Sequence, residues 1–387
     1  MKIVIAPDSF KESLSSLEAA QAIARGLQEA LSDCDAMIVP IADGGEGTVD
    51  SVLSARKGES VQVDVQGPLG ETVAARYGLI EQGSTAIIEM ASASGLALIP
   101  PEHRNPLKTS TYGTGELILH ACRRGARRIL LGIGGSATVD GGAGCLRALG
   151  LVLYDSQGNP LPGTGGCLDS IDRIDHRLIP RELYDTRIEV LCDVNNPLLG
   201  EEGSAAIFGP QKGADEHCVS LLEKGLAHWS RLLLDLTGKD LSATPGSGAS
   251  GGLGYGLSAL LDAALVPGCE TLLSIAGLSE ALSGADLVIT GEGRLDATSA
   301  RGKVVSGVAH LAQSFEIPTI ALAGTLGPGH EALYSQGITT AFSLVNGPCD
   351  LREAIQSSDT WLENLAFRVG KLLAICPPPS SCEDPFR

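Results

Sequence analysis

Aromatic and charged residues are scarce in this sequence: aromatics make up 4% and charged side chains 19% of its 387 residues. Basic residues are the minority, because the chain has 28 Lys and Arg but 46 Asp and Glu. Its formal net charge is therefore -18. So acidic a chain repels polyanions, which excludes nucleic acid as a partner. No apolar run is long enough for a transmembrane helix. We therefore expect a cytoplasmic monomer or homodimer that acts on small molecules and not at a membrane.

Several signatures of other protein classes are missing. The ten cysteines form no Cys-x-x-Cys pair, so we expect reduced thiols and no disulfide framework. The seven histidines lack His-Glu-x-x-His spacing, which argues against a zinc hydrolase of that type. Neither a Gly-x-x-x-x-Gly-Lys-Ser/Thr loop nor a His-Arg-Asp motif is present, which excludes the P-loop and protein-kinase designs.

Glycine, in contrast, is abundant: the chain contains 49, roughly twice the usual share of about 7%. A hydrophobic content of 43% excludes a disordered chain. The glycines must therefore occupy turns, close backbone approaches or ligand-binding loops.

Both ends of the chain alternate strand-like and helix-like segments, which predicts doubly wound α/β structure with a parallel sheet. The expected strands are 3–6, 36–41, 285–290, 319–323 and 340–345, and the expected helices 17–31, 47–55 and 303–315. Between them, 74–80 and 84–90 flank a turn and predict an antiparallel hairpin. We therefore predict two α/β domains: a discontinuous one of residues 1–68 and 268–375, and an inserted mixed α/β domain of residues 69–267. Residues 376–387 form a Pro-rich tail that cannot continue a helix.

Within the inserted part, the expected strands are 128–133, 149–154 and 188–193, with helices near 116–124 and 257–264. The glycine-rich segment 241–256 is either a flexible linker or a structured loop that leads into a helix.

Two loops at the ends of the first strands carry chemistry-bearing side chains. Asp8, Ser9 and Lys11 follow the first strand, at the edge where open α/β sheets bind ligands. The motif Asp43-Gly-Gly-Glu-Gly47 follows the second, and paired acids are typical Mg²⁺ ligands. Ordinary turn chemistry and helix capping remain alternatives for both loops.

The run Gly132 to Gly144 follows another expected strand. Gly132, Gly134 and Ala137 match the dinucleotide-binding pattern, but Gly-rich loops after strands are common in this chain. Ser136, Thr138 and Asp140 fit a loop that binds phosphate or a hydroxy acid better.

Two further loops complete the candidates. Asp193, in Asp193-Val-Asn-Asn-Pro197, is placed as a general base or a metal ligand, with an Asp/Asn/Pro turn as the alternative. The segment 290–304 concentrates acids, hydroxyls and cations, a mixture suited to phosphoryl transfer. Its members are Glu292, Arg294, Asp296, Thr298, Ser299, Arg301 and Lys303.

Five of these loops, in this order and spacing, resemble the bacterial glycerate kinase family from Met1 to about Ile375. They are Ala6-Pro-Asp-Ser-Phe-Lys11, Asp43-Gly-Gly-Glu-Gly47, Gly134-Gly-Ser-Ala-Thr138, Asp193-Val-Asn-Asn-Pro197 and Gly291-Glu-Gly-Arg-Leu-Asp296 with Gly302-Lys303. The resemblance implies a Rossmann-like discontinuous domain and a site between two domains. It also implies ATP-dependent phosphorylation of D-glycerate to 2-phosphoglycerate, although the sequence does not exclude 3-phosphoglycerate.

On this resemblance, Asp193 is the expected base, with Asp296 as its rival, and Asp43 and Glu292 are the expected Mg²⁺ ligands. Lys11 and Lys303 would neutralise phosphoryl or carboxylate charge, and Arg294 would grip the glycerate carboxylate. The remaining expected contacts to substrate or phosphate are Asp8, Ser9, Gly134, Gly135, Ser136, Thr138 and Ser299. An NAD-dependent hydroxy-acid oxidoreductase and a non-catalytic hydroxy-acid-binding protein are the alternatives.

Overall fold

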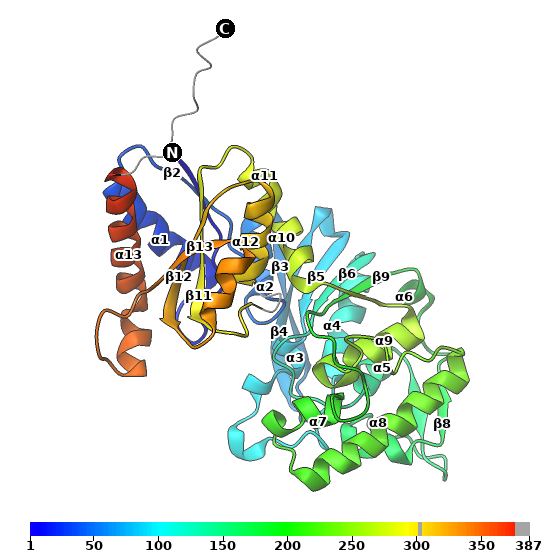
Figure 1. Cartoon of the computed structure of the whole chain (residues 1–387). Helices are drawn as coiled ribbons and strands as arrows, with labels where there is room; N and C mark the ends of the chain where they lie inside the picture. The colour runs from blue at the N-terminus through cyan, green and yellow to red at the C-terminus, as the bar shows by residue number, and fades with distance from the viewer. Residues whose placement is uncertain (301–303, 376–387) are drawn as a thin grey trace. The chain divides into compact units, whose positions relative to one another are not determined.

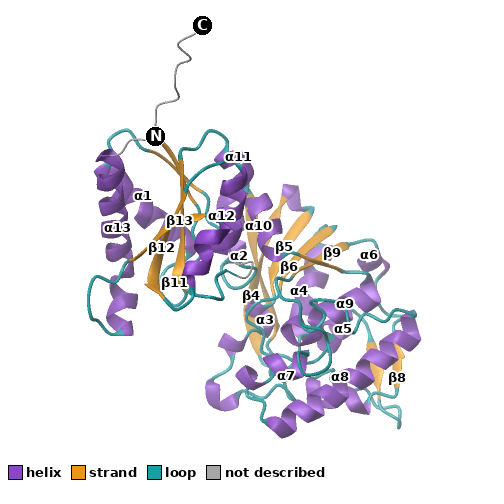
Figure 2. Cartoon of the chain, viewed as in Figure 1, coloured by secondary structure: helices purple, strands orange, loops and turns teal. Residues whose placement is uncertain are grey.

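A computed structural model describes residues 1–300 and 304–375. The chain forms two compact units, of which the first combines Met1–Asp43 with the segment from Cys269 onward, and the second is Gly44–Gly268. Both units mix helices and strands (Figures 1 and 2). The α/β fold class expected from the sequence is confirmed.

The first unit is built on a parallel five-stranded sheet in the order β13-β12-β11-β1-β2. Its strands are β1 (Lys2–Ile5), β2 (Asp35–Ile38), β11 (Leu287–Leu295), β12 (Thr319–Leu326) and β13 (Ile338–Ser343). Its helices are α1 (Ser16–Ala30), α10 (Gly268–Ala276), α11 (Leu278–Leu282), α12 (Val304–Ser314) and α13 (Leu351–Ile375).

Helices cover both faces of this sheet, because successive side chains of a strand point to opposite faces. Ile3 and Ile5 of β1 pack with α1 and α13, while Val4 packs with α10, α11 and α12. Figure 1 shows the two helix layers on either side of the strands. Helix α1 starts at a capping box, in which Ser15 Oγ accepts from the Glu18 amide and Glu18 accepts from the Ser15 amide.

The second unit contains a mixed six-stranded sheet in the order β10-β9-β6-β5-β4-β3. Its strands are β3 (Gly58–Gln66), β4 (Thr72–Ile80), β5 (Thr85–Glu89), β6 (Arg128–Gly132), β9 (Arg187–Leu191) and β10 (Ala264–Val266), and β7 (Val152–Tyr154) pairs separately with β8 (Arg173–Asp175). Its helices are α2 (Thr48–Ala55), α3 (Ala91–Ser94), α4 (Tyr112–Arg123), α5 (Ala143–Ala148), α6 (Arg181–Tyr184), α7 (Ser204–Phe208), α8 (Glu216–Thr237) and α9 (Leu253–Leu261).

The antiparallel hairpin expected from the sequence is present as β4 and β5, but it has a third member. Strand β3 pairs antiparallel with β4 along its whole length. Residues 44–68 therefore group with the inserted unit, and the first boundary falls at Asp43/Gly44 instead of the expected 68/69.

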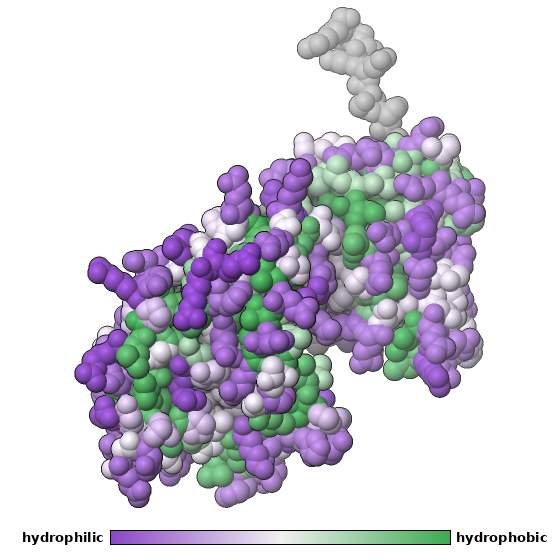
Figure 3. All heavy atoms as spheres, turned by 180° about the vertical axis from the view of Figure 1, so that it is seen from behind, coloured by the Kyte–Doolittle hydropathy of each residue, from purple (hydrophilic) through white to green (hydrophobic). Residues whose placement is uncertain are grey.

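Hydrophilic and hydrophobic residues are interspersed on the face drawn in Figure 3. In the described ranges, no helix combines the length and the apolar content needed to cross a membrane. The eight cysteines of those ranges carry free thiols.

Candidate active site

Three acidic side chains of the first unit gather where parallel strands end. Asp8 follows β1, Asp43 follows β2, and Glu292 lies in the neighbouring strand β11. The Asp8 amide donates to the Gly291 carbonyl at 2.8 Å, which brings the end of β1 beside Glu292. Lys11 Nζ lies 3.1 Å from Asp43 Oδ2. We call Asp8, Asp43, Glu292 and Lys11 the carboxylate cluster.

The carboxylate cluster carries more negative than positive charge. Asp8 is only 3% exposed, and burial, reinforced by Asp43 and Glu292, raises the pKa of Asp8 to about 7. A backbone hydrogen bond from Ser9 opposes this shift, since the Ser9 amide donates to Asp8 Oδ1 at 2.7 Å. The neighbouring Asp43 raises the pKa of Lys11. An added cation would therefore be stabilised here.

The donor set of the carboxylate cluster fits Mg²⁺, which prefers carboxylate oxygens. Within residues 1–300 and 304–375, no three His, Cys, Asp or Glu side chains form a ready-made metal cage. Mg²⁺ does not require one, because it is usually held by one or two carboxylates, water and substrate phosphates. Asp43 and Glu292 would supply such carboxylates.

Side chains at the end of β11 and in the loop that follows it contact one another. Arg294 Nε lies 3.1 Å from Asp296 Oδ2, and Asp296 Oδ1 accepts from the Thr298 amide at 2.8 Å. Ser299 Oγ accepts from the Asp296 amide at 3.2 Å. Both carboxylate oxygens of Asp296 are thus engaged locally. The predicted Lys303, like Arg301, lies outside the described residues.

Glycine loops of the second unit pack tightly against one another. A Cβ on Gly132 would overlap the Gly44 carbonyl oxygen, and one on Gly134 would lie 2.9 Å from Gly45 Cα. A Cβ on Gly251 would overlap the Thr138 carbonyl oxygen. The segment 241–256 is therefore not a flexible linker, and Gly132 and Gly134 serve loop packing. The dinucleotide pattern also requires a helix at its last glycine or alanine, whereas α5 begins only at Ala143.

Ser136 and Thr138 lie in the loop of residues 133–140, which follows β6. Lys212, in the short turn Pro210–Lys212, donates to Ser136 Oγ and to the Thr138 carbonyl oxygen, each at 2.7 Å. Gly135, the other predicted member, has φ +72°, which favours glycine. No sequence pattern marks Lys212, because no motif surrounds it and its partners are 74 and 76 residues away.

Asp193 follows β9, at the same edge of the sheet as the 133–140 loop that follows β6. Its Oδ1 accepts from the Gly268 amide at 2.8 Å, at the last residue of the second unit. Asp193 therefore has a structural contact in addition to any catalytic role.

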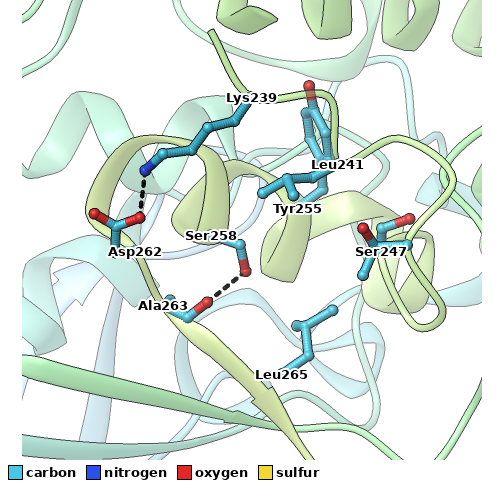
Figure 4. A pocket seen from close by; sticks show the side chains of 9 residues that line it. Lys239, Leu241, Ser247, Tyr255, Ser258, Asp262, Ala263 and Leu265 are labelled. Carbon is cyan, nitrogen blue, oxygen red and sulfur yellow. Dashed lines mark hydrogen bonds and ion pairs between the residues drawn. The ribbon is translucent and has the colours of Figure 1, made fainter. Parts of the chain in front are cut away.

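A separate cavity of about 300 Å³ lies beside β10 (Figure 4). It is lined by Lys239, Leu241, Thr244, Ser247, Tyr255, Ser258, Asp262, Ala263 and Leu265. Lys239 pairs with Asp262, and Ser258 Oγ donates to the Ala263 carbonyl at 2.7 Å, so these polar groups satisfy one another. None of the predicted site residues lines this cavity.

Comparison with known proteins gives concordant matches over nearly the whole chain. The family model described as the glycerate kinase family matches residues 3–374. A glycerate kinase of Halalkalibacterium halodurans is 48% identical over 95% of this chain and 97% of its own. The glycerate 2-kinase of Escherichia coli is 46% identical over 97% of this chain and 98% of its own. A crystal structure assigned as a glycerate kinase 2 from Salmonella typhimurium LT2 superposes with a TM-score of 0.86 at 44% identity and covers 97% of this chain and 99% of that one.

Proposed function

Because the chain belongs to the glycerate kinase family, we propose that it phosphorylates the 2-hydroxyl of D-glycerate with Mg²⁺ and ATP. The name of the Escherichia coli relative, glycerate 2-kinase, supports 2-phosphoglycerate as the product over 3-phosphoglycerate. The observation that carries the proposal is the carboxylate cluster with its Lys11 ion pair at the ends of parallel strands.

Asp43 and Glu292 would hold Mg²⁺, with Asp8 beside them. The metal would supply positive charge that offsets the charge on the phosphate oxygens. Lys11 would add a cation at the same edge of the sheet. Positioning and charge neutralisation provide most of the catalysis in such a reaction, since phosphoryl transfer needs little covalent work from the protein.

In the reaction, the glycerate hydroxyl oxygen bonds to the γ-phosphorus while the bond from that phosphorus to the β,γ-bridging oxygen breaks. ADP leaves, and Asp193 accepts the hydroxyl proton. Arg294 would bind the glycerate carboxylate through its guanidinium fork. Ser9, Ser299 and the 133–140 loop would supply further hydroxyl and amide donors to substrate oxygens.

A coupled assay tests this proposal. The purified protein, given Mg²⁺, ATP and D-glycerate, should release ADP, and ³¹P NMR of the product should show the 2-phosphate and not the 3-phosphate. Release of ADP that does not depend on glycerate would contradict the assigned substrate. Reduction of NAD by D-glycerate without ADP would favour the oxidoreductase alternative, and glycerate binding without either reaction would favour a binding protein.

A further inference from the structure

Lys212 places a buried positive charge behind the 133–140 loop. Its side chain is 1% exposed, and its Nζ donates to Ser136 Oγ and to the Thr138 carbonyl oxygen at 2.7 Å. A buried ammonium is costly unless hydrogen bonds or an opposite charge compensate it. Two neutral acceptors provide only part of that compensation.

The carboxylate that acts on Lys212 does so without direct contact. Asp140 Oδ2 accepts from the amide and the hydroxyl of Thr111 and from the Gly144 amide, while Oδ1 accepts from the Gly142 amide. Burial lowers the pKa of Lys212 to about 7, and Asp140 opposes that shift only by its charge. In the part of the chain that the structure describes, Lys212 forms no ion pair by contact, so no contacting carboxylate offsets the charge of its protonated form.

The ammonium also decides which way the Ser136 hydroxyl points. In its protonated form Lys212 can only donate, so Ser136 Oγ then accepts from Lys212 and directs its own hydrogen elsewhere. Ser136 keeps 8% of its surface exposed, whereas Thr138 is fully buried. Within the described ranges, Thr138 Oγ1 is buried without a hydrogen-bond partner. The loop thus contains one hydroxyl that the Lys212 ammonium turns into a donor and one hydroxyl without a partner in the described ranges.

We propose that Lys212 is a positioning residue that makes Ser136 a donor to a substrate oxyanion, which is the glycerate carboxylate or an ATP phosphate. This inference rests on the proposed function and deepens it. Hydrogen bonds with an ionised donor or acceptor are roughly twice as strong as neutral ones, which suits a chain from the Lys212 ammonium through the Ser136 hydroxyl to an anion.

Steady-state kinetics of ADP release, with glycerate and ATP varied separately, test the proposal. Lys212→Met and Ser136→Ala should each raise the KM for one substrate about tenfold or more and change kcat by less than about threefold. A raised KM for glycerate identifies the carboxylate, and a raised KM for ATP identifies a phosphate. The double variant should be no worse than the worse single variant, since both residues act through one contact.

Two further variants separate positioning from structure. Lys212→Arg keeps the charge and should retain a lower KM than Lys212→Met. Lys224→Met is the matched control, because Lys224 pairs with Asp169 on the exposed side of α8 in the same unit and should leave both KM values unchanged. Should Lys212→Met not fold, Ser136→Ala carries the same test, since it leaves the buried charge in place.

Unchanged KM values in folded Lys212→Met and Ser136→Ala would overturn the inference. Variants that lose melting temperature but keep both KM values would overturn it as well. If the wild-type chain releases no ADP, the proposed function fails instead. Titration calorimetry of the wild type and Ser136→Ala with D-glycerate and with ATP then decides the inference independently. Equal affinities in the two proteins would reject it, and affinity lost about tenfold in Ser136→Ala would support it.

Discussion

The Asp8 carboxylate destabilises the folded chain when it is ionised, because it is buried beside Asp43 and Glu292. Its pKa rises from 3.8 in the unfolded chain to about 7 in the folded chain. The folded state therefore retains a proton that the unfolded state loses between pH 4 and 7. The contribution of Asp8 to stability is fully present below pH 4 and is lost as the pH rises through 7.

Asp8→Asn should consequently stabilise the protein, since an amide carries no charge to bury. The gain in the free energy of unfolding should be larger at pH 8 than at pH 5, by about 2 kcal/mol. Denaturant titrations at the two pH values measure it. Asp35→Asn, an exposed position on β2, is the control, and the same gain at both pH values would contradict the electrostatic explanation.

Asp193 has two roles to separate: the proposed base and the acceptor for the Gly268 amide. Asn keeps an acceptor oxygen but cannot take the proton, so Asp193→Asn should fold normally and lose about 100-fold or more in kcat. Asp193→Ala should lose stability as well. A folded Asp193→Asn with turnover within about threefold of wild type would remove Asp193 as the base.

Motifs at strand ends marked several single residues whose side chains the structure places together. Asp8, Lys11, Asp43 and Glu292 were all proposed from their loops, and the structure brings them together. Lys212 was not found, because its contact with Ser136 depends on tertiary structure across 76 residues.

Among the elements, the glycine loops illustrate how packing overrides local flexibility. Gly248 lies against the Pro197 carbonyl, and its Cβ would overlap that oxygen although its backbone dihedrals suit any residue. Gly248→Ala should therefore destabilise the protein through steric overlap alone, by about 2 kcal/mol or more. Thermal unfolding tests this expectation. Gly347→Ala, where a Cβ meets nothing within 4 Å, should be neutral, and equal effects of both changes would contradict the packing argument.

Strand β3 is the element that sequence patterns should have revealed and did not. Val61, Val63 and Val65 alternate with polar residues, which is the period of a half-buried strand. Without that strand, residues 44–68 were grouped with the first domain. The strands of the first unit and its helices α1 and α12 were expected from the sequence, because their apolar runs end at turn residues. Helices α10, α11 and α13 of the same unit were not among the expected elements.

At the scale of the whole molecule, the second unit is continuous in sequence and the first is not. The core of the second unit, from Val61 to Ala263, draws its buried residues only from that unit. In the first unit, β1 pairs with β11, although most of the sequence lies between these two strands. We propose that the second unit is an independent folding domain, whereas the two segments of the first unit fold only together.

A fragment of residues 44–268 should therefore unfold cooperatively on its own, whereas residues 1–43 should not fold in isolation. Circular dichroism during thermal melting of the two fragments measures this. A non-cooperative melt of the 44–268 fragment would show that its core depends on the first unit.

The net charge of -18 repels both proposed substrates, so the proposed phosphoryl transfer would rely on local cations and on Mg²⁺ at the carboxylate cluster. The Mg²⁺ dependence of ADP release in the wild type, Asp43→Asn and the control Asp35→Asn tests this most directly. We predict that Asp43→Asn needs at least about tenfold more Mg²⁺ for half-maximal turnover, while Asp35→Asn behaves as wild type. An unchanged Mg²⁺ requirement in a folded Asp43→Asn would contradict the account.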